Sequence, residues 1–342
     1  MKFTRVLPGL GLASLLFLPA SLSVEGAVIV WQGVSGTGGA GNWLNPDHWV
    51  GGVVPTSADD AEFTQGTGNV GLGNFLRSAA KITFTSGSGA YTINSGSTSP
   101  QGLSVGSGGI INNSSATQTF GNASTYSIAT TASQSWQAVS GDLSFSTAVN
   151  LGANTLTLNA GASRTITLGG TISGTGGLSK SGAGTMVVTG ASSYSGATAL
   201  SAGTLRYEVD QVFSGALNLS GGNLDQNDRF LSFDSMSLLG STTLTLGTDL
   251  TSQNIVAGSA TWTAGTLTVE NWSPSATSDK LFIAVQPSAA LLNNINFTGF
   301  GSGATWLQSG EIVPVPEPET YTIVAGVALL GVAAVRRHLR RR

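Results

Sequence analysis

The segment Gly176–Leu205, GGLSKSGAGTMVVTGASSYSGATALSAGTL, holds the clearest internal pattern in this chain of 342 residues. Short runs that mix apolar residues with threonine or serine, such as Thr185–Gly190 (TMVVTG), are separated by glycine and alanine. Alternation with a period of two is typical of a strand with one buried face. Glycine between such runs indicates tight corners, because it adopts positive φ angles without strain. The segment therefore predicts consecutive short strands joined by turns.

The same pattern recurs along most of the chain. The AGTL ending returns at Ala202–Leu205 and Ala264–Leu267, and no amphipathic helix of 12 or more residues is expected between Val28 and Val313. Repetition of one strand-and-turn unit favours a solenoid over a sandwich or barrel. Further alternating runs occur at Lys81–Thr85, Asn154–Ala160, Arg164–Gly170, Thr243–Gly247 and Gly265–Trp272.

The segment 176–205 resembles the autotransporter-associated β-strand repeat. The matching positions are Lys180, Gly182, Gly184, Tyr194, Gly196, Ala202, Gly203 and Leu205. The resemblance implies an all-β, right-handed parallel β-helix, which we expect to span residues 76–270. Coils of roughly 20–25 residues would stack about 4.8 Å apart, with leucine, isoleucine and valine facing inward.

Composition limits the function classes. Only 9% of the residues are charged, against roughly 25% in a typical soluble domain. Between Val28 and Val315 there are 7 basic and 14 acidic residues, a net charge of −7. This acidic balance argues against nucleic acid as a partner. Cysteine is absent, so the core is expected to be stable without disulfides.

The first residues have the three parts of a secretory signal peptide. Lys2 and Arg5 precede an apolar run from Val6 to Leu18, and small residues follow up to Ala27. The run is shorter than the ~20 residues that a membrane-spanning helix needs, which disfavours an uncleaved anchor. We therefore expect residues 1–27 to direct export.

The last residues predict a short membrane helix. Residues 321–335 (YTIVAGVALLGVAAV) carry no charge and would extend roughly 22 Å as a helix. A buried helix of a soluble domain is the alternative, but an arginine cluster directly after the run favours a membrane stop with a cytoplasmic anchor. That cluster consists of Arg336, Arg337, Arg340, Arg341 and Arg342.

A proline-rich motif precedes this helix. Val315-Pro316-Glu317-Pro318, an apolar helix and an arginine cluster follow in that order, and residues 314–342 thereby resemble the PEP-CTERM sorting signal of Gram-negative envelope proteins. The resemblance implies that an exosortase-type membrane enzyme recognises Pro316, Glu317 and Pro318 and releases or transfers the body. The protein would then be anchored transiently in the inner membrane before it reaches the cell surface or the extracellular space.

The segments that flank the solenoid differ from it in composition. Residues 28–75 contain Trp31, Trp43 and Trp49, which we expect to cover the first coil, although a sugar-stacking platform is the alternative. Residues 271–313 resemble the closing segment of PEP-CTERM surface proteins and are expected to cover the other end.

Motifs for catalysis are weak. Gly102–Gly106 (GLSVG) matches a nucleophile elbow, but such an elbow needs a following helix and a histidine, and His48 is the one histidine before residue 314. Gly36–Gly41 (GTGGAG) lacks the helix that a phosphate loop opens. No catalytic residue and no cofactor are therefore expected.

Metal ligands are equally sparse. Asp225, Asn227 and Asp228 form a weak candidate calcium site beside Arg229, although a solvated surface turn is the favoured interpretation. Asp59 and Asp60 are interpreted as turn residues.

These observations favour a non-enzymatic β-solenoid of the cell surface or extracellular matrix, with a structural or adhesive role alongside exopolysaccharide. A β-helix polysaccharide lyase or glycoside hydrolase is the alternative, in which the 225–229 cluster would supply the acidic groups and the base. An autotransporter passenger is disfavoured, because no C-terminal series of alternating strands is present.

Overall fold

A computed structural model describes residues 26–315 except 35, 37, 74, 96–100, 122–125, 249–253 and 276. The predicted signal peptide up to residue 25 lies outside the described residues. The predicted motif Pro316-Glu317-Pro318, the membrane helix 321–335 and the arginine cluster lie outside them too.

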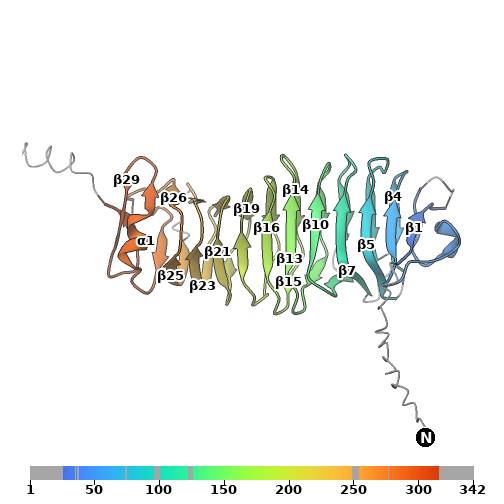
Figure 1. Cartoon of the computed structure of the whole chain (residues 1–342), viewed down its shortest axis with the longest axis horizontal. Helices are drawn as coiled ribbons and strands as arrows, with labels where there is room; N and C mark the ends of the chain where they lie inside the picture. Colours follow the sequence, from blue (N-terminus) through green and yellow to red (C-terminus); the bar gives the residue numbers. More distant parts are fainter. Residues whose placement is uncertain are drawn as a thin grey trace, which may run out of the picture.

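The described chain is an all-β parallel solenoid whose strands stack along the long axis (Figure 1). The larger, 16-stranded sheet follows the path β1 (Val28–Trp31), β3 (Asp60–Phe63), β5 (Arg77–Phe84), β7 (Gln101–Asn112), β10 (Gln134–Ala138), β13 (Leu156–Ala160), β16 (Leu178–Ser181), β18 (Thr198–Leu200), β21 (Ala216–Leu219), β23 (Leu231–Leu238), β25 (Ile255–Trp262) and β27 (Leu281–Ile283). Its side branches are β9 (Tyr126–Thr130), β12 (Ala148–Asn150), β15 (Ile172–Ser173) and β20 (Gln211–Val212).

The second sheet has 13 strands, of which all but the last pair in parallel. They are β2 (Gly41–Asn42), β4 (Gly68–Gly71), β6 (Tyr91–Asn94), β8 (Gln118–Phe120), β11 (Leu143–Phe145), β14 (Thr165–Leu168), β17 (Thr185–Val188), β19 (Thr204–Tyr207), β22 (Asn223–Asp225), β24 (Thr242–Thr245), β26 (Leu267–Glu270), β28 (Ile295–Phe297) and β29 (Gly301–Ser302). A separate hairpin joins β30 (Ala304–Trp306) to β31 (Ile312–Pro314).

Helix is almost absent from the described residues. The 3₁₀ helix η1 (Pro46–His48) and the helix α1 (Ala289–Asn293) are single turns. None of the helices in the described part of the chain is long and apolar enough to span a membrane. The expectation that no long amphipathic helix interrupts the strands is confirmed for these residues.

The six alternating runs named from the sequence all contain strands. For example, Thr185–Gly190 contains β17, which lies within the segment 176–205. Gly265–Trp272, further along the chain, contains β26. The register gives the coil length directly: Leu156 lies opposite Leu178, 22 positions on, and Leu178 lies opposite Thr198, 20 positions on. Val28, however, lies opposite Asp60, 32 positions on, so the first coil is longer than the predicted 20–25 residues. It is longer because it also contains η1 and the tryptophan segment.

Inward-facing side chains form stacked rows. One row of the larger sheet runs through register partners that are buried at nearly every level: Trp136, Leu158, Lys180, Leu200, Leu219 and Leu238. Each side chain packs on the equivalent one above and below, so the core is continuous along the solenoid. Lys180 is the one ionisable member of this row.

Antiparallel segments cover the edge strands at both ends. At the first coil, Trp31 of β1 forms a bridge with Trp49, and the Val50 amide donates to the Val30 carbonyl at 2.9 Å. At the last coil, Phe282 of β27 forms a bridge with Glu311, and the Ile283 amide donates to the Gly310 carbonyl at 2.8 Å. Occupied edges prevent the end-to-end pairing that an open parallel stack would invite.

Candidate functional site

The outward face of the second sheet carries a regular row of hydroxyl and amide side chains. Seven register partners on consecutive levels contribute to it, and all are half-buried. We call them the threonine row: Thr165, Thr185, Thr204, Asn223, Thr243, Thr268 and Asn296. Strand spacing places neighbours about 4.8 Å apart, and none of them is ionisable. The row is therefore a neutral strip of donors and acceptors along the solenoid.

A second outward row of the same sheet, two positions further along each strand, is more mixed. We call it the charged row: Thr167, Val187, Arg206, Asp225, Thr245 and Glu270. The Thr245 hydroxyl contacts the Glu270 carboxylate at 3.1 Å. Arg206, Asp225 and Glu270 thus lie to one side of the threonine row, and the Asp142 carboxylate lies at the start of that row, where it accepts from the Thr165 amide at 2.9 Å.

The three weak metal candidates do not converge on one point, although the Asn227 amide donates to the Asp225 Oδ1 at 3.1 Å. Asp225 lies opposite Arg206, and the Arg206 Nη2 donates to the Asn227 Oδ1 at 2.7 Å. Asn227 Nδ2 in turn donates to Glu208 at 2.9 Å. The Asp228 carboxylate lies instead against Gly247 in the next coil. An arginine thus takes the position between these groups that a calcium ion would need.

Burial raises the pKa of the Asp225 carboxyl above its ordinary value. Arg206 lowers this pKa, whereas the carboxylates of Glu208 and Asp228 raise it further. Within the described ranges, no group of three or more His, Cys, Asp or Glu side chains is placed to hold a metal ion.

The other sequence motifs are built into strands and turns. Gly102–Gly106 lies inside β7, where Ser104 pairs with Ser78 and Ala129 on the two sides, so no elbow is formed. His48 is buried in η1 beside the backbone of Asn42. Asp59 is a turn residue as predicted, since its carboxylate accepts from the Thr56 amide at 3.0 Å. The prediction for Asp60 is wrong: it begins β3, where alternation turns it toward Lys81.

The three N-terminal tryptophans are fully buried. Trp31 and Trp43 each pack on Trp49, with ring centroids 4.8 and 5.0 Å apart, and Phe63 lies below them. Their faces are covered by protein, so the sugar-stacking alternative is wrong for these residues.

Lys180, one of the matching repeat positions, is buried in the core of the solenoid. Its side chain points into the core row, and its Nζ donates to the carbonyls of Ser181 and Gly182 at 2.7 Å and to that of Ala202 at 3.1 Å. Ser181 and Gly182 lie at the corner of its own coil, and Ala202 at the corner of the next. Gly203 adopts φ +67° there, and a Cβ at that position would clash with the lysine amine. Burial lowers the pKa of Lys180 to about 8.

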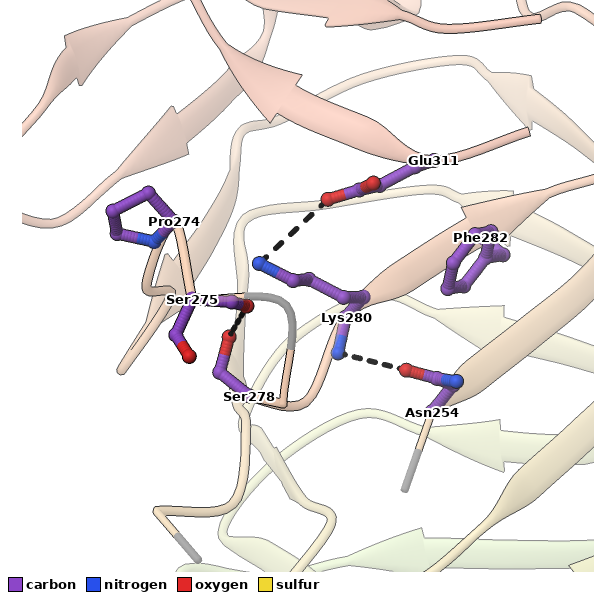
Figure 2. Close-up of a pocket in the computed structure, with 7 residues that line it drawn as sticks. All are labelled: Asn254, Pro274, Ser275, Ser278, Lys280, Phe282 and Glu311. Carbon is purple, nitrogen blue, oxygen red and sulfur yellow. Dashed lines mark hydrogen bonds and ion pairs between the residues drawn. The ribbon is translucent and has the colours of Figure 1, made fainter. Parts of the chain in front are cut away.

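A cleft near the C-terminal end was not predicted from the sequence. It has a volume of about 370 Å³, and Figure 2 shows its lining side chains. They come from segments far apart in the chain: Asn254, Pro274, Ser275, Ser278, Lys280, Phe282 and Glu311.

Comparison with known proteins identifies the central repeat. Residues 178–206 match the profile of the family described as Passenger-associated-transport-repeat. No curated protein and no solved structure matches the chain. The match confirms the repeat predicted at 176–205, and it covers β16, β17, β18 and most of β19. The protein is thus a parallel β-solenoid that carries this repeat, and the repeat indicates an exported or surface protein.

Proposed function

We propose that this chain is a non-enzymatic scaffold of the cell surface or extracellular matrix that associates with exopolysaccharide. The threonine row is the observation that carries the proposal. A hydroxyl group both donates and accepts, as do the hydroxyls of a glycan, and the backbone groups of these strands are already paired within the sheets. Contacts of this kind are weak singly, but a polymer engages many levels at once and gains affinity by multivalency.

The arrangement of charge supports binding without catalysis. A lyase or glycosidase needs carboxylates and a base that converge on one open site. Asp225, a carboxylate of the cluster that the lyase alternative would use, instead lies 3.9 Å from Arg206, which also forms an ion pair with Glu208 at 2.9 Å. We therefore propose neither a catalytic residue nor a cofactor.

Removing the hydroxyls of the threonine row should weaken polysaccharide binding. We expect the triple variant Thr185→Val, Thr204→Val and Thr243→Val to lose about tenfold or more in affinity, because each hydrogen bond contributes ~0.5–1.5 kcal/mol. Valine keeps the branched shape and the strand preference, so stability should be retained. Cosedimentation of the full-length chain with a neutral β-glucan and with a uronic-acid polymer measures the effect.

The matched control is the triple threonine-to-serine variant, which keeps every hydroxyl and should sediment like the wild type. Equal sedimentation of the valine variant would contradict the role of this row. New unsaturated sugar ends in the same incubations would instead favour the lyase alternative.

We also propose that the C-terminal segment directs sorting by an exosortase-type enzyme. Changing Pro316, Glu317 and Pro318 together to alanine should leave an unprocessed form in the inner membrane, because proline holds the backbone in the extended form that a processing enzyme can bind. Membrane fractionation and immunoblotting measure this, with Pro314→Ala as the control outside the motif. Normal surface delivery of the triple variant would refute the sorting assignment.

A further inference from the structure

The C-terminal cleft lies where the last long coil meets the hairpin β30–β31. Asn254 precedes β25, Lys280 and Phe282 lie at β27, and Glu311 precedes β31 (Figure 2). The backbone holds these positions closely, since Phe282 bridges Glu311 and the Lys280 amide donates to the Asn254 Oδ1 at 3.1 Å. Three of the segments that line the cleft are therefore joined directly to one another.

Two opposite charges face the same space in this cleft. The Lys280 Nζ lies 3.7 Å from the Glu311 Oε1, beyond the ~2.7–3.2 Å of a direct hydrogen bond. The amine is oriented by the Ser273 carbonyl and by the Trp272 ring, whose centroid lies 4.8 Å away. The ammonium can donate and the carboxylate can accept. A ligand hydroxyl at this point can therefore bond both, accepting from one and donating to the other.

The remaining walls alternate apolar and polar surface. Pro274 and Phe282 offer apolar area, whereas Asn254, Ser275 and Ser278 offer amide and hydroxyl groups. A sugar ring has the same division, with apolar C–H faces and a rim of hydroxyls. A volume of about 370 Å³ suits a small ligand and not a folded partner. One positive and one negative side chain leave the cleft without net charge, which favours a neutral ligand.

We infer that this cleft binds a neutral sugar residue, as a free monosaccharide or as the end of a glycan chain. The inference rests on the proposed association with polysaccharide, but it uses residues entirely separate from the threonine row. The row would contact the length of a polymer, and the cleft would hold a chain end.

Glu311→Gln tests the inference with the full-length chain. The amide keeps the shape of the carboxylate but removes its charge, so affinity for a neutral sugar should fall at least about fivefold, as expected for the loss of one charge-assisted hydrogen bond. The probes are glucose, galactose, mannose and N-acetylglucosamine, with glucuronate as the charged comparison, each followed by saturation-transfer NMR and calorimetry. Glu270→Gln on the charged row is the matched control and should bind like the wild type.

A second variant guards against loss of folding. Ser275 is exposed, and Ser275→Leu should fill the cleft from the surface and abolish sugar binding without disturbing the core. If none of the sugars binds, the assignment of the cleft is wrong. If the polymer still cosediments with the chain in that case, the proposed function is not affected. Binding that survives both cleft variants but disappears in the valine variant assigns the sugar to the threonine row. Tighter binding of glucuronate than of the neutral sugars overturns the charge argument.

Discussion

Trp49→Ala is expected to lower the free energy of unfolding by about 3–5 kcal/mol, the usual loss for a fully buried large aromatic side chain. Trp49 is 0% exposed, packs on Trp31 and Trp43, and donates from Nε1 to the Trp43 carbonyl at 2.7 Å. Its backbone also bridges β1, the first strand of the larger sheet. Guanidinium denaturation followed by tryptophan fluorescence and circular dichroism measures the change.

The same variant should loosen the cover over the first coil. Light scattering is expected to detect association of Trp49→Ala, because an edge strand that loses its cover offers unpaired backbone groups to another chain. Leu44→Ala is the control from the same segment; Leu44 is 39% exposed, so its loss should stay within about 0.5 kcal/mol. If the two variants unfold at the same denaturant concentration, the tryptophans do not stabilise this end.

The strands were predictable because their signal is local. In runs such as Arg164–Gly170 and Thr243–Gly247, every second residue is apolar, and a strand with one face in the core requires this spacing. Coil length was less predictable at the first level. The 32-residue step from Val28 to Asp60 depends on how the tryptophan segment folds back over β1. That arrangement is tertiary and leaves no periodic trace in the sequence.

Site residues were harder to predict, because solenoid stacking joins positions that are about one coil apart. Asp225, Asn227 and Asp228 are neighbours in sequence, which made them a weak candidate for a calcium site beside the favoured interpretation, a surface turn. Asn227 and Asp228 both adopt positive φ angles, 53° and 55°, and the chain turns sharply there. Arg206 from the preceding coil then enters the gap. Register, and not sequence proximity, decides which side chains meet.

The residues that line the C-terminal cleft could not be predicted from the sequence either, because they come from segments far apart in the chain. Asn254, Lys280 and Glu311 come together only when the hairpin closes on β27, and no short motif contains them. Lys180 was noticed as a repeat position, but its inward direction follows only from its register with Leu158 and Leu200. A polar residue in an otherwise apolar row is the signal that could have revealed it.

Lys180→Met should lower stability at pH 7 by about 1–3 kcal/mol. Methionine keeps the length of the stem in the leucine row, but the carbonyls of Ser181, Gly182 and Ala202 lose their donor. Hydrogen bonds to a charged group contribute ~1.5–3 kcal/mol each, and relief of the buried charge offsets part of that loss. Lys180→Leu continues the apolar row and should behave in the same way. Urea denaturation of the three proteins measures the difference.

The pH dependence of the free energy of unfolding distinguishes the contribution of the Lys180 amine from that of side-chain packing. Because burial lowers the pKa of Lys180 to about 8, from 10.5, the unfolded chain holds the proton more tightly between these values. The free energy of unfolding therefore rises with pH between pH 8 and 10.5. The neutral amine can still donate hydrogen bonds to the backbone carbonyls of Ser181, Gly182 and Ala202. The difference in the free energy of unfolding between wild type and Lys180→Met should therefore increase by ~1–2 kcal/mol from pH 8 to about 10.

Buried tyrosines make the free energy of unfolding fall with rising pH, so wild type has to be compared with Lys180→Met at each pH. Burial raises the pKa of Tyr91 and Tyr194 to about 12, so above pH 10 the unfolded chain loses protons that the folded chain keeps, and stability falls in both proteins. Subtracting the two stability curves cancels this fall and leaves the contribution of Lys180. A difference that stays constant between pH 8 and 10 would mean that Lys180 has the same pKa in the folded and unfolded chains, and it would contradict the lowered pKa.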